Sequence, residues 1–175
     1  EPMREMRHNT SERILLADIG NTCVKIGLAD ASGLGETWSL PTRIPHTSDS
    51  LGLALTGLLG RAGLGEGDVA ACAVCSVVPD LTPMLCDAVA RYLACPTLNF
   101  PEDFAPGLEN RYDNPSQVGA DRLLAAFAAR RLFPEPASLI SVDFGTATTF
   151  DCVTGEAYLG GLICPGVLSS HGALA

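Results

Sequence analysis

Two short segments of this sequence share one pattern, in which an apolar strand ends near an aspartate and a glycine with small polar residues follows. The first segment is LLADIGNTCVKIGL around Asp18, and the second is SVDFGTATTFD around Asp143. A strand-terminal carboxylate can hold a metal ion or its waters, and glycine lets backbone N–H groups approach a phosphate. Two facing copies could grip the phosphates of a nucleotide from opposite sides. Simple hairpin turns are the alternative, but the repetition favours phosphate binding.

A third candidate for chemistry lies in the loop RYDNPSQVGADR. Asp121 falls in the first turn of the helix that we expect from about 119 to 133, where the helix macrodipole favours an ionised carboxylate. Such a carboxylate could accept a proton from a substrate hydroxyl as that hydroxyl attacks a phosphoryl group. A carboxylate that only stabilises the helix fits the spacing equally well.

These residues need a scaffold, and the apolar pattern predicts an α/β layer with a mixed sheet. Strands are expected at 14–19, 23–29, 37–41, 69–78 and 96–100, and a helix at 49–64. Asp80 is the expected cap of a further helix that ends near Tyr92. A long loop then leads to the helix at 119–133, after which the strand–turn–strand pattern of the N-terminus starts again at 138.

Composition excludes some classes of protein. The net charge of −9 argues against a nucleic-acid surface, which requires a basic stripe, although a local nucleotide site remains compatible with it. No apolar run reaches the roughly 18 residues that cross a membrane. Seven cysteines in apolar contexts indicate free thiols in a reducing cytoplasm. Cys72 and Cys75 form a C-x-x-C pair, but their apolar strand favours core positions over a zinc site.

Five motifs in order, spanning nearly all of residues 14–168, closely resemble the type III pantothenate kinases of the actin/sugar kinase/Hsp70 superfamily. These motifs are DIGNT, SVVP, YDNPSQVGADR, VDFGTATTFD and GGLICPG. The resemblance implies a duplicated ribonuclease-H-like fold with ATP between two domains. We therefore expect a disordered extension at 1–13 and a first domain with substrate loop and linking helix at 14–134. A second, incomplete domain is expected at 135–175.

The resemblance also implies an activity, namely transfer of the γ-phosphoryl group of ATP to the primary hydroxyl of pantothenate, the first step of coenzyme A biosynthesis. It implies Mg²⁺, a monovalent cation such as K⁺ or NH₄⁺, and a cytoplasmic homodimer, with no nucleic-acid or membrane partner. By motif, Asp121 is the general base, Asp18 helps to hold Mg²⁺–ATP, and Asp143 lies near the phosphates or the monovalent cation.

The remaining site residues carried over by motif fall into two groups. The phosphate-binding group, in addition to Asp18, is Gly20, Asn21, Thr22, Lys25, Gly145, Thr146 and Thr148. The substrate-side group is Tyr112, Asn114, Gly119, Ala120 and Arg122. Arg122 could receive the carboxylate of pantothenate, or form a salt bridge at a dimer contact. Lys25 could touch a phosphate, but a solvated strand lysine is the simpler interpretation.

Two other functions stay open. Family members continue past the last motif, and a degenerate copy could serve as a non-catalytic accessory factor. The presence of Asp18, Asp121 and Asp143 speaks against degeneracy. Another kinase of the same superfamily, acting on a different small hydroxyl substrate, is the second alternative, and the YDNP and GADR segments favour pantothenate over it.

Overall fold

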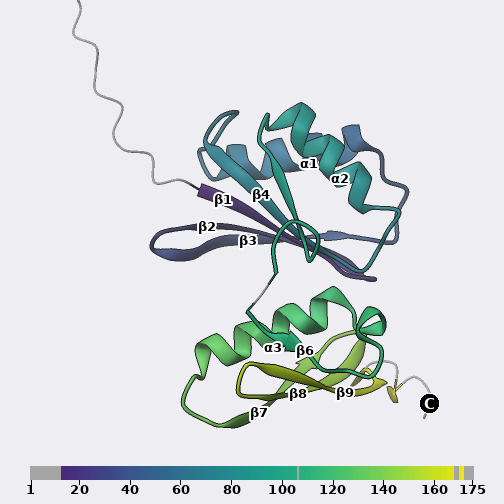
Figure 1. Ribbon diagram of the computed structural model, residues 1–175. Coiled ribbons are helices and arrows are strands. Elements are labelled where there is room, and N and C mark those ends of the chain that lie inside the picture. Colours follow the sequence, from purple (N-terminus) through teal and green to yellow (C-terminus); the bar gives the residue numbers. More distant parts are fainter. Residues whose placement is uncertain (1–12, 106, 168–169, 172–175) are drawn as a thin grey trace, which may run out of the picture.

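The chain forms two lobes, each built on its own β-sheet (Figure 1). The computed structural model describes residues 13–105, 107–167, 170 and 171. The first lobe contains the first sheet with helices α1 and α2, and the second contains helix α3 and the second sheet. The predicted mixed α/β architecture is confirmed.

The first sheet has five strands in the order β3-β2-β1-β4-β5. Its strands are β1 (Arg13–Ile19), β2 (Cys23–Asp30), β3 (Gly33–Pro41), β4 (Val69–Ser76) and β5 (Thr97–Phe100). The first three form an antiparallel meander, and β4 and β5 run parallel to β1. β3 begins four residues before the predicted strand at 37–41, because it pairs with β2 back to Gly33.

Helices α1 (Ser48–Arg61) and α2 (Thr82–Tyr92) cover one face of this sheet, where Leu15, Ala17 and Ile19 of β1 are buried (Figure 1). The expected cap of α2 is wrong. Asp80 lies in a turn, and the helix begins after Leu81, which makes no side-chain cap hydrogen bond. The start shifts because the Thr82 hydroxyl bonds to Ser76 Oγ and thereby ties the helix to the end of β4. No helix in the described part of the chain is long and apolar enough to cross a bilayer.

The second lobe repeats the meander. Its elements are β6 (Glu109–Asn110), the 3₁₀ turn η1 (Pro115–Gln117), α3 (Ala120–Leu132), β7 (Ser138–Phe144), β8 (Ala147–Thr154) and β9 (Ala157–Pro165). The sheet order is β6-β9-β8-β7, and α3 packs on β7 and β8. The buried core of the second lobe contains residues from α3 and from the segments on either side of β6, as well as from the second sheet. By packing, this lobe therefore begins near β6, whereas the boundary expected near residue 134 is the point at which the sequence repeat begins.

The repeat makes Ile140, Val142 and Phe144 of β7 the counterparts of the buried apolar residues of β1. Their exposed fractions are 64%, 41% and 73%, whereas Leu15 and Ile19 in β1 are fully buried. The reason is that α1 and α2 cover the first sheet, and no described residues cover the equivalent face of the second. The same alternating pattern thus produces a core in one lobe and an open apolar face in the other.

All seven cysteines are free thiols, and the predicted C-x-x-C pair lies inside the protein. Cys72 is fully buried and Cys75 is 5% exposed. Burial raises the pKa of both thiols to about 12. Both are therefore neutral at physiological pH, which suits core positions and not metal ligation.

The contact between α1 and α2 depends on a glycine. A Cβ at Gly52 would collide with the ring of Tyr92, whose hydroxyl donates to Asp49 at 2.8 Å. We predict that Gly52→Ala destabilises the protein by about 1–3 kcal/mol through overpacking, in spite of its better helix propensity. Chemical denaturation would measure the change. Gly57→Ala in the same helix is the control, because its Cβ would meet no atom within 4 Å, and it should stabilise by about 1 kcal/mol. Equal effects at both positions would contradict the packing argument.

Candidate functional site

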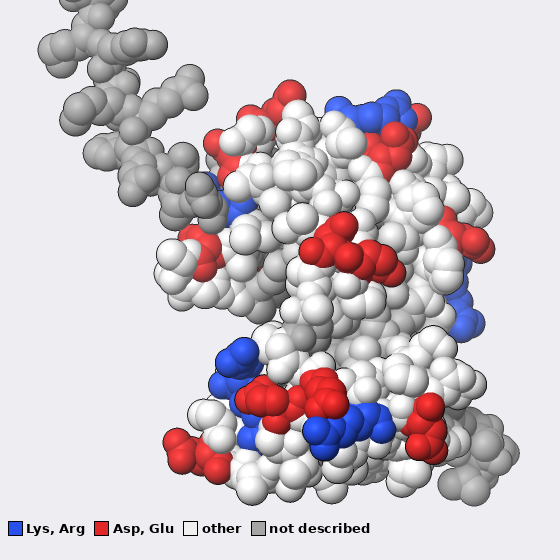
Figure 2. Space-filling view, in the orientation of Figure 1, with Lys and Arg blue, Asp and Glu red and all other residues white. Residues whose placement is uncertain are grey.

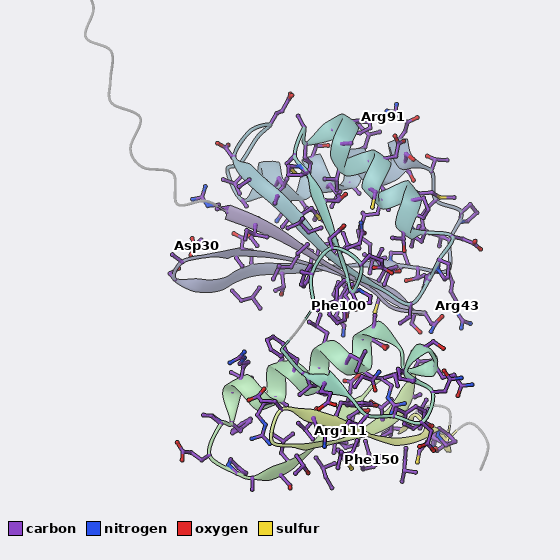
Figure 3. The ribbon with its side chains drawn as sticks, in the orientation of Figure 1. Asp30, Arg43, Arg91, Phe100, Arg111 and Phe150 are labelled. Atoms are coloured by element: carbon purple, nitrogen blue, oxygen red, sulfur yellow. The ribbon has the colours of Figure 1, made fainter. Side chains whose placement is uncertain are left out.

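The first phosphate-type turn joins β1 to β2 and is held from behind by the end of β3. Gly20 N–H donates to the Cys23 carbonyl at 3.1 Å, and the Thr42 hydroxyl donates to the Gly20 carbonyl at 2.7 Å. Arg43 Nε donates to the Asn21 carbonyl at 3.2 Å, and Figure 3 shows Arg43 at the end of the sheet away from the β2–β3 hairpin. These bonds fix the turn without using the side chains of Asn21 and Thr22, which stay exposed.

The second turn joins β7 to β8 in the same way. Gly145 N–H donates to the Ala147 carbonyl at 2.9 Å. Gly166, the last glycine of the GGLICPG motif, lies against this turn, and a Cβ there would collide with the carbonyl oxygens of Gly145 and Thr146. A glycine is therefore required at position 166 for this close packing.

The two turns meet between the lobes. Thr22 Oγ1 and Thr146 Oγ1 are 2.6 Å apart and hydrogen-bonded, although the residues come from different sheets. The surface is hollowed between the lobes in Figure 2. Thr148, also predicted for the phosphate cradle, is only 7% exposed and lies behind the turn. The structure thus brings together the tips of the two predicted turns.

Three predicted carboxylates are close enough to interact electrostatically, since the charges of two of them influence the third. Burial raises the pKa of Asp18, and the charges of Asp121 and Asp143 raise it further, while the nearby Lys25 lowers it. The Lys25 ammonium lies 3.6 Å from Asp18 Oδ2, and both side chains are partly exposed. The ends of β1 and β7 and the start of α3 therefore bring three negative charges near the two turns.

The Asp121 side chain is held at the start of α3 by the backbone N–H of the next residue. Gly119 is the N-cap of the helix, and Asp121 Oδ1 accepts the N–H of Arg122 at 2.8 Å. A Cβ at Gly119 would lie 2.5 Å from the same oxygen. The glycine in the GADR motif therefore leaves room for the carboxylate, and Ala120 is the first residue of the helix.

Arg122 is not a free cation. Its side chain is 13% exposed, and its guanidinium forms an ion pair with Asp151 of β8, with Nη2 2.6 Å from Oδ1. Asp151 was not among the residues predicted for the site. The signal for it was a single carboxylate at the end of the VDFGTATTFD motif, two strand positions before the apolar Val153, which is buried.

The substrate-side loop is seated on the second lobe. The ring of Tyr112 packs on Gly160, whose φ is +111°, and a Cβ there would lie 2.6 Å from the ring. Tyr112 N–H donates to Asn110 Oδ1 at 3.1 Å. Asn114 is the N-cap of η1, and its Oδ1 accepts the Ser116 hydroxyl at 2.8 Å. The motif residues thus lie together on the path from β6 to α3.

The donor set fits a hydrated divalent cation. Mg²⁺ takes oxygen ligands and retains several waters, so it needs only one or two carboxylates. No cluster of three or more His, Cys, Asp or Glu side chains suited to direct metal binding occurs in the described ranges. A cation near Asp18 would offset the unfavourable contributions of the Asp121 and Asp143 charges, which are smaller than that of burial.

The fold defines the class of protein first. The structure is similar to that of the Ppx/GppA phosphatase of Aquifex aeolicus, with a TM-score of 0.55 and 13% identity. The match covers 93% of this chain and 55% of that chain. At this identity the likeness shows a shared two-lobed fold and nothing about chemistry.

The family follows from sequence comparison. A profile of the type III pantothenate kinase family matches residues 14–175. The chain is 60% identical over 161 residues to the type III pantothenate kinase of Oleidesulfovibrio alaskensis, covering 92% of this chain and 61% of that protein. It is 58% identical over 165 residues to the enzyme of Nitratidesulfovibrio vulgaris strain Miyazaki F, covering 94% and 63%. The chain belongs to the type III pantothenate kinase family and spans about three fifths of the length of these relatives.

The raised pKa of Asp18 predicts a measurable effect on stability. A carboxyl whose pKa is higher in the folded chain than in the unfolded chain loses its stabilising contribution as pH rises through the folded pKa. Asp18→Asn should therefore raise the melting temperature at pH 7 more than at pH 3 in buffer without divalent cations. Differential scanning fluorimetry would measure it, with Asp80→Asn, in the exposed turn before α2, as the control. If the difference in melting temperature between Asp18→Asn and the wild type does not grow with pH, the raised pKa of Asp18 is contradicted.

Proposed function

We propose that the complete protein phosphorylates pantothenate with ATP, the first step of coenzyme A biosynthesis. The observation that carries this proposal is the meeting of the two Asp-x-Gly turns at Thr22 and Thr146, with Asp121 acting on the same space as Asp18 and Asp143. Membership of the type III pantothenate kinase family names the phosphoryl acceptor.

In this reaction Asp121 accepts the proton of the primary hydroxyl of pantothenate as the hydroxyl oxygen attacks the γ-phosphorus of ATP. Its carboxylate is exposed at the α3 terminus and restrained by one backbone bond, which suits a general base. Phosphoryl transfer depends mainly on positioning and charge stabilisation. Two rigid turns on opposing lobes supply the positioning.

The phosphates are received by the two turns. The exposed Asn21, Thr22 and Thr146 provide donors, and Gly20 and Gly145 let the phosphates approach the backbone. Thr148 supports the second turn from its buried position, and Lys25 balances the charge of Asp18.

On the substrate side, Tyr112, Asn114, Gly119 and Ala120 shape the pocket, and Arg122 faces the carboxylate of pantothenate. Asp18 would hold Mg²⁺ through water, and Asp143 a monovalent cation, K⁺ or NH₄⁺. When bound, these cations neutralise charge that develops on the phosphoryl oxygens. We further propose a cytoplasmic homodimer, and the seven free thiols support a reducing compartment.

The first test is direct detection of 4′-phosphopantothenate by mass spectrometry. The protein, at the full length that its gene encodes, is incubated with ATP, Mg²⁺, K⁺ and pantothenate. We expect product, and we expect Asp121→Asn to lower kcat by roughly 10²–10⁴-fold because the proton acceptor is lost. Its Mg²⁺–ATP affinity, measured by calorimetry, should stay close to that of the wild type.

Two variants sharpen this test. Asp18→Asn should weaken Mg²⁺–ATP binding, because the carboxylate nearest the first turn is lost. Asp68→Asn carries the same chemical change at the other end of the first sheet, where Asp68 caps a turn before β4, and should leave both properties unchanged. Equal losses of turnover and ATP affinity in both Asp18→Asn and Asp121→Asn would contradict the division of roles.

A further inference from the structure

Asp151 is the centre of a buried polar cluster that joins α3 to the second sheet. Its side chain is 2% exposed, and Oδ1 accepts Arg122 Nε at 2.9 Å and the Tyr158 hydroxyl at 2.8 Å. Arg122 Nη2 lies 2.6 Å from the same oxygen. Burial raises the pKa of Tyr158, and Asp151 raises it further, so this hydroxyl stays protonated and donates. Two side chains from two elements thus converge on one carboxylate oxygen.

Arg122 links this cluster to the proposed general base. Its guanidinium is held by Asp151, while its backbone N–H donates to Asp121 Oδ1 at 2.8 Å. Gly161 leaves room for the guanidinium at this place, because a Cβ there would lie 2.9 Å from Nη2. The position of the Asp121 carboxylate therefore depends on where β8 holds Arg122.

Stability alone is a poor explanation for this ion pair. Burying two charges costs desolvation free energy, and apolar side chains of similar size are often as stabilising. The geometry is also not the ideal fork, because Nε and Nη2 approach the same oxygen and Nη2 makes no directed hydrogen bond. What the arrangement does provide is one defined orientation of Arg122.

We propose that Asp151 is a positioning residue for the phosphoryl transfer. It holds the Arg122 guanidinium and, through the Arg122 backbone, fixes the Asp121 carboxylate relative to the two phosphate turns. In this role Asp151 acts through Arg122 and Asp121 and does not itself contact the substrate. The inference rests on the proposed function, since it assigns a role within that reaction.

The principal test is Asp151→Asn in the full-length protein, a change that keeps the size of the side chain and removes its charge. We expect kcat to fall on the order of 100-fold, as for a misplaced reacting group, with KM for ATP unchanged. Tyr158→Phe is the matched control, because it removes one donor and leaves the ion pair. It should keep kcat within about threefold. Full activity of Asp151→Asn, or equal losses in both variants, would overturn the proposal.

A double-mutant cycle separates positioning from a general structural defect. In the Asp121→Asn background, adding Asp151→Asn should lower kcat by less than about threefold, because the group that it positions is already lost. If Asp151→Asn lowers kcat in this background by the same factor as in the wild-type background, the proposal is overturned.

If Asp151→Asn does not fold, Asp151→Glu keeps the charge and moves the carboxylate. It should remain folded, as circular dichroism would show, and lose turnover, and wild-type turnover would be contrary evidence.

The two proposals fail in different ways. Product from the wild type and from Asp151→Asn at the same rate would remove only the positioning role. No product from a folded wild type would remove the proposed function and the role of Asp151 within it.

Nitrogen-15 NMR of Arg122 tests the geometry without any turnover. The Arg122 Nε–H should exchange with solvent slowly in the wild type and quickly in Asp151→Asn. Fast exchange in the wild type would show that Asp151 does not restrain the Arg122 side chain.

Discussion

The hydrogen bond between Thr22 and Thr146 is the interaction on which the proposed site depends, because it joins the turns of the two lobes. Asp18, Asp121 and Asp143 come from β1, α3 and β7, and their charges meet at the mouth of two turns. Such an arrangement holds only if each carboxylate is carried by an element that is fixed elsewhere. The strands are fixed by their sheets, and α3 is fixed by its packing on β7 and β8. The fold therefore holds the three carboxylates on elements that are fixed independently of one another, and a cation near Asp18 would offset part of their charge.

Close backbone approach assembles the part of the site that belongs to the second lobe. Gly166 packs against the second turn, Gly160 and Gly161 receive Tyr112 and Arg122, and Gly119 leaves room for Asp121. In each case a Cβ would meet an atom at 2.9 Å or less. The glycines of the motifs are explained by this packing, which joins the substrate-side loop to the second sheet. Gly160 is required for a second reason as well, because its φ of +111° is a conformation that residues with a side chain rarely adopt.

The ion pair between Arg122 and Asp151 gives the second lobe a part in the proposed chemistry. Asp121 stands on α3, which contacts both β4 of the first sheet and β8 of the second. Packing holds α3 against β7 and β8, and a polar link between its first turn and β8 fixes it further. The buried pair adds the cross-link, and Tyr158 secures the carboxylate that forms it. The positioning proposed for Asp121 therefore depends on a contact inside the second lobe, between α3 and β8.

The sequence by itself determined the local structure and the identity of the family. Alternating apolar residues predicted most strands, and the helix spacing predicted α3 to within one residue at each end, because these signals depend on near neighbours. The two Asp-x-Gly turns and Asp121 were recognisable as candidates for the same reason. Only the tertiary structure decided which residues meet. The bond between Thr22 and Thr146, the pairing of Arg122 with Asp151 and the short β6 all join distant parts of the chain. The open face of β7 was equally hidden, because burial depends on what packs above a strand and not on its pattern.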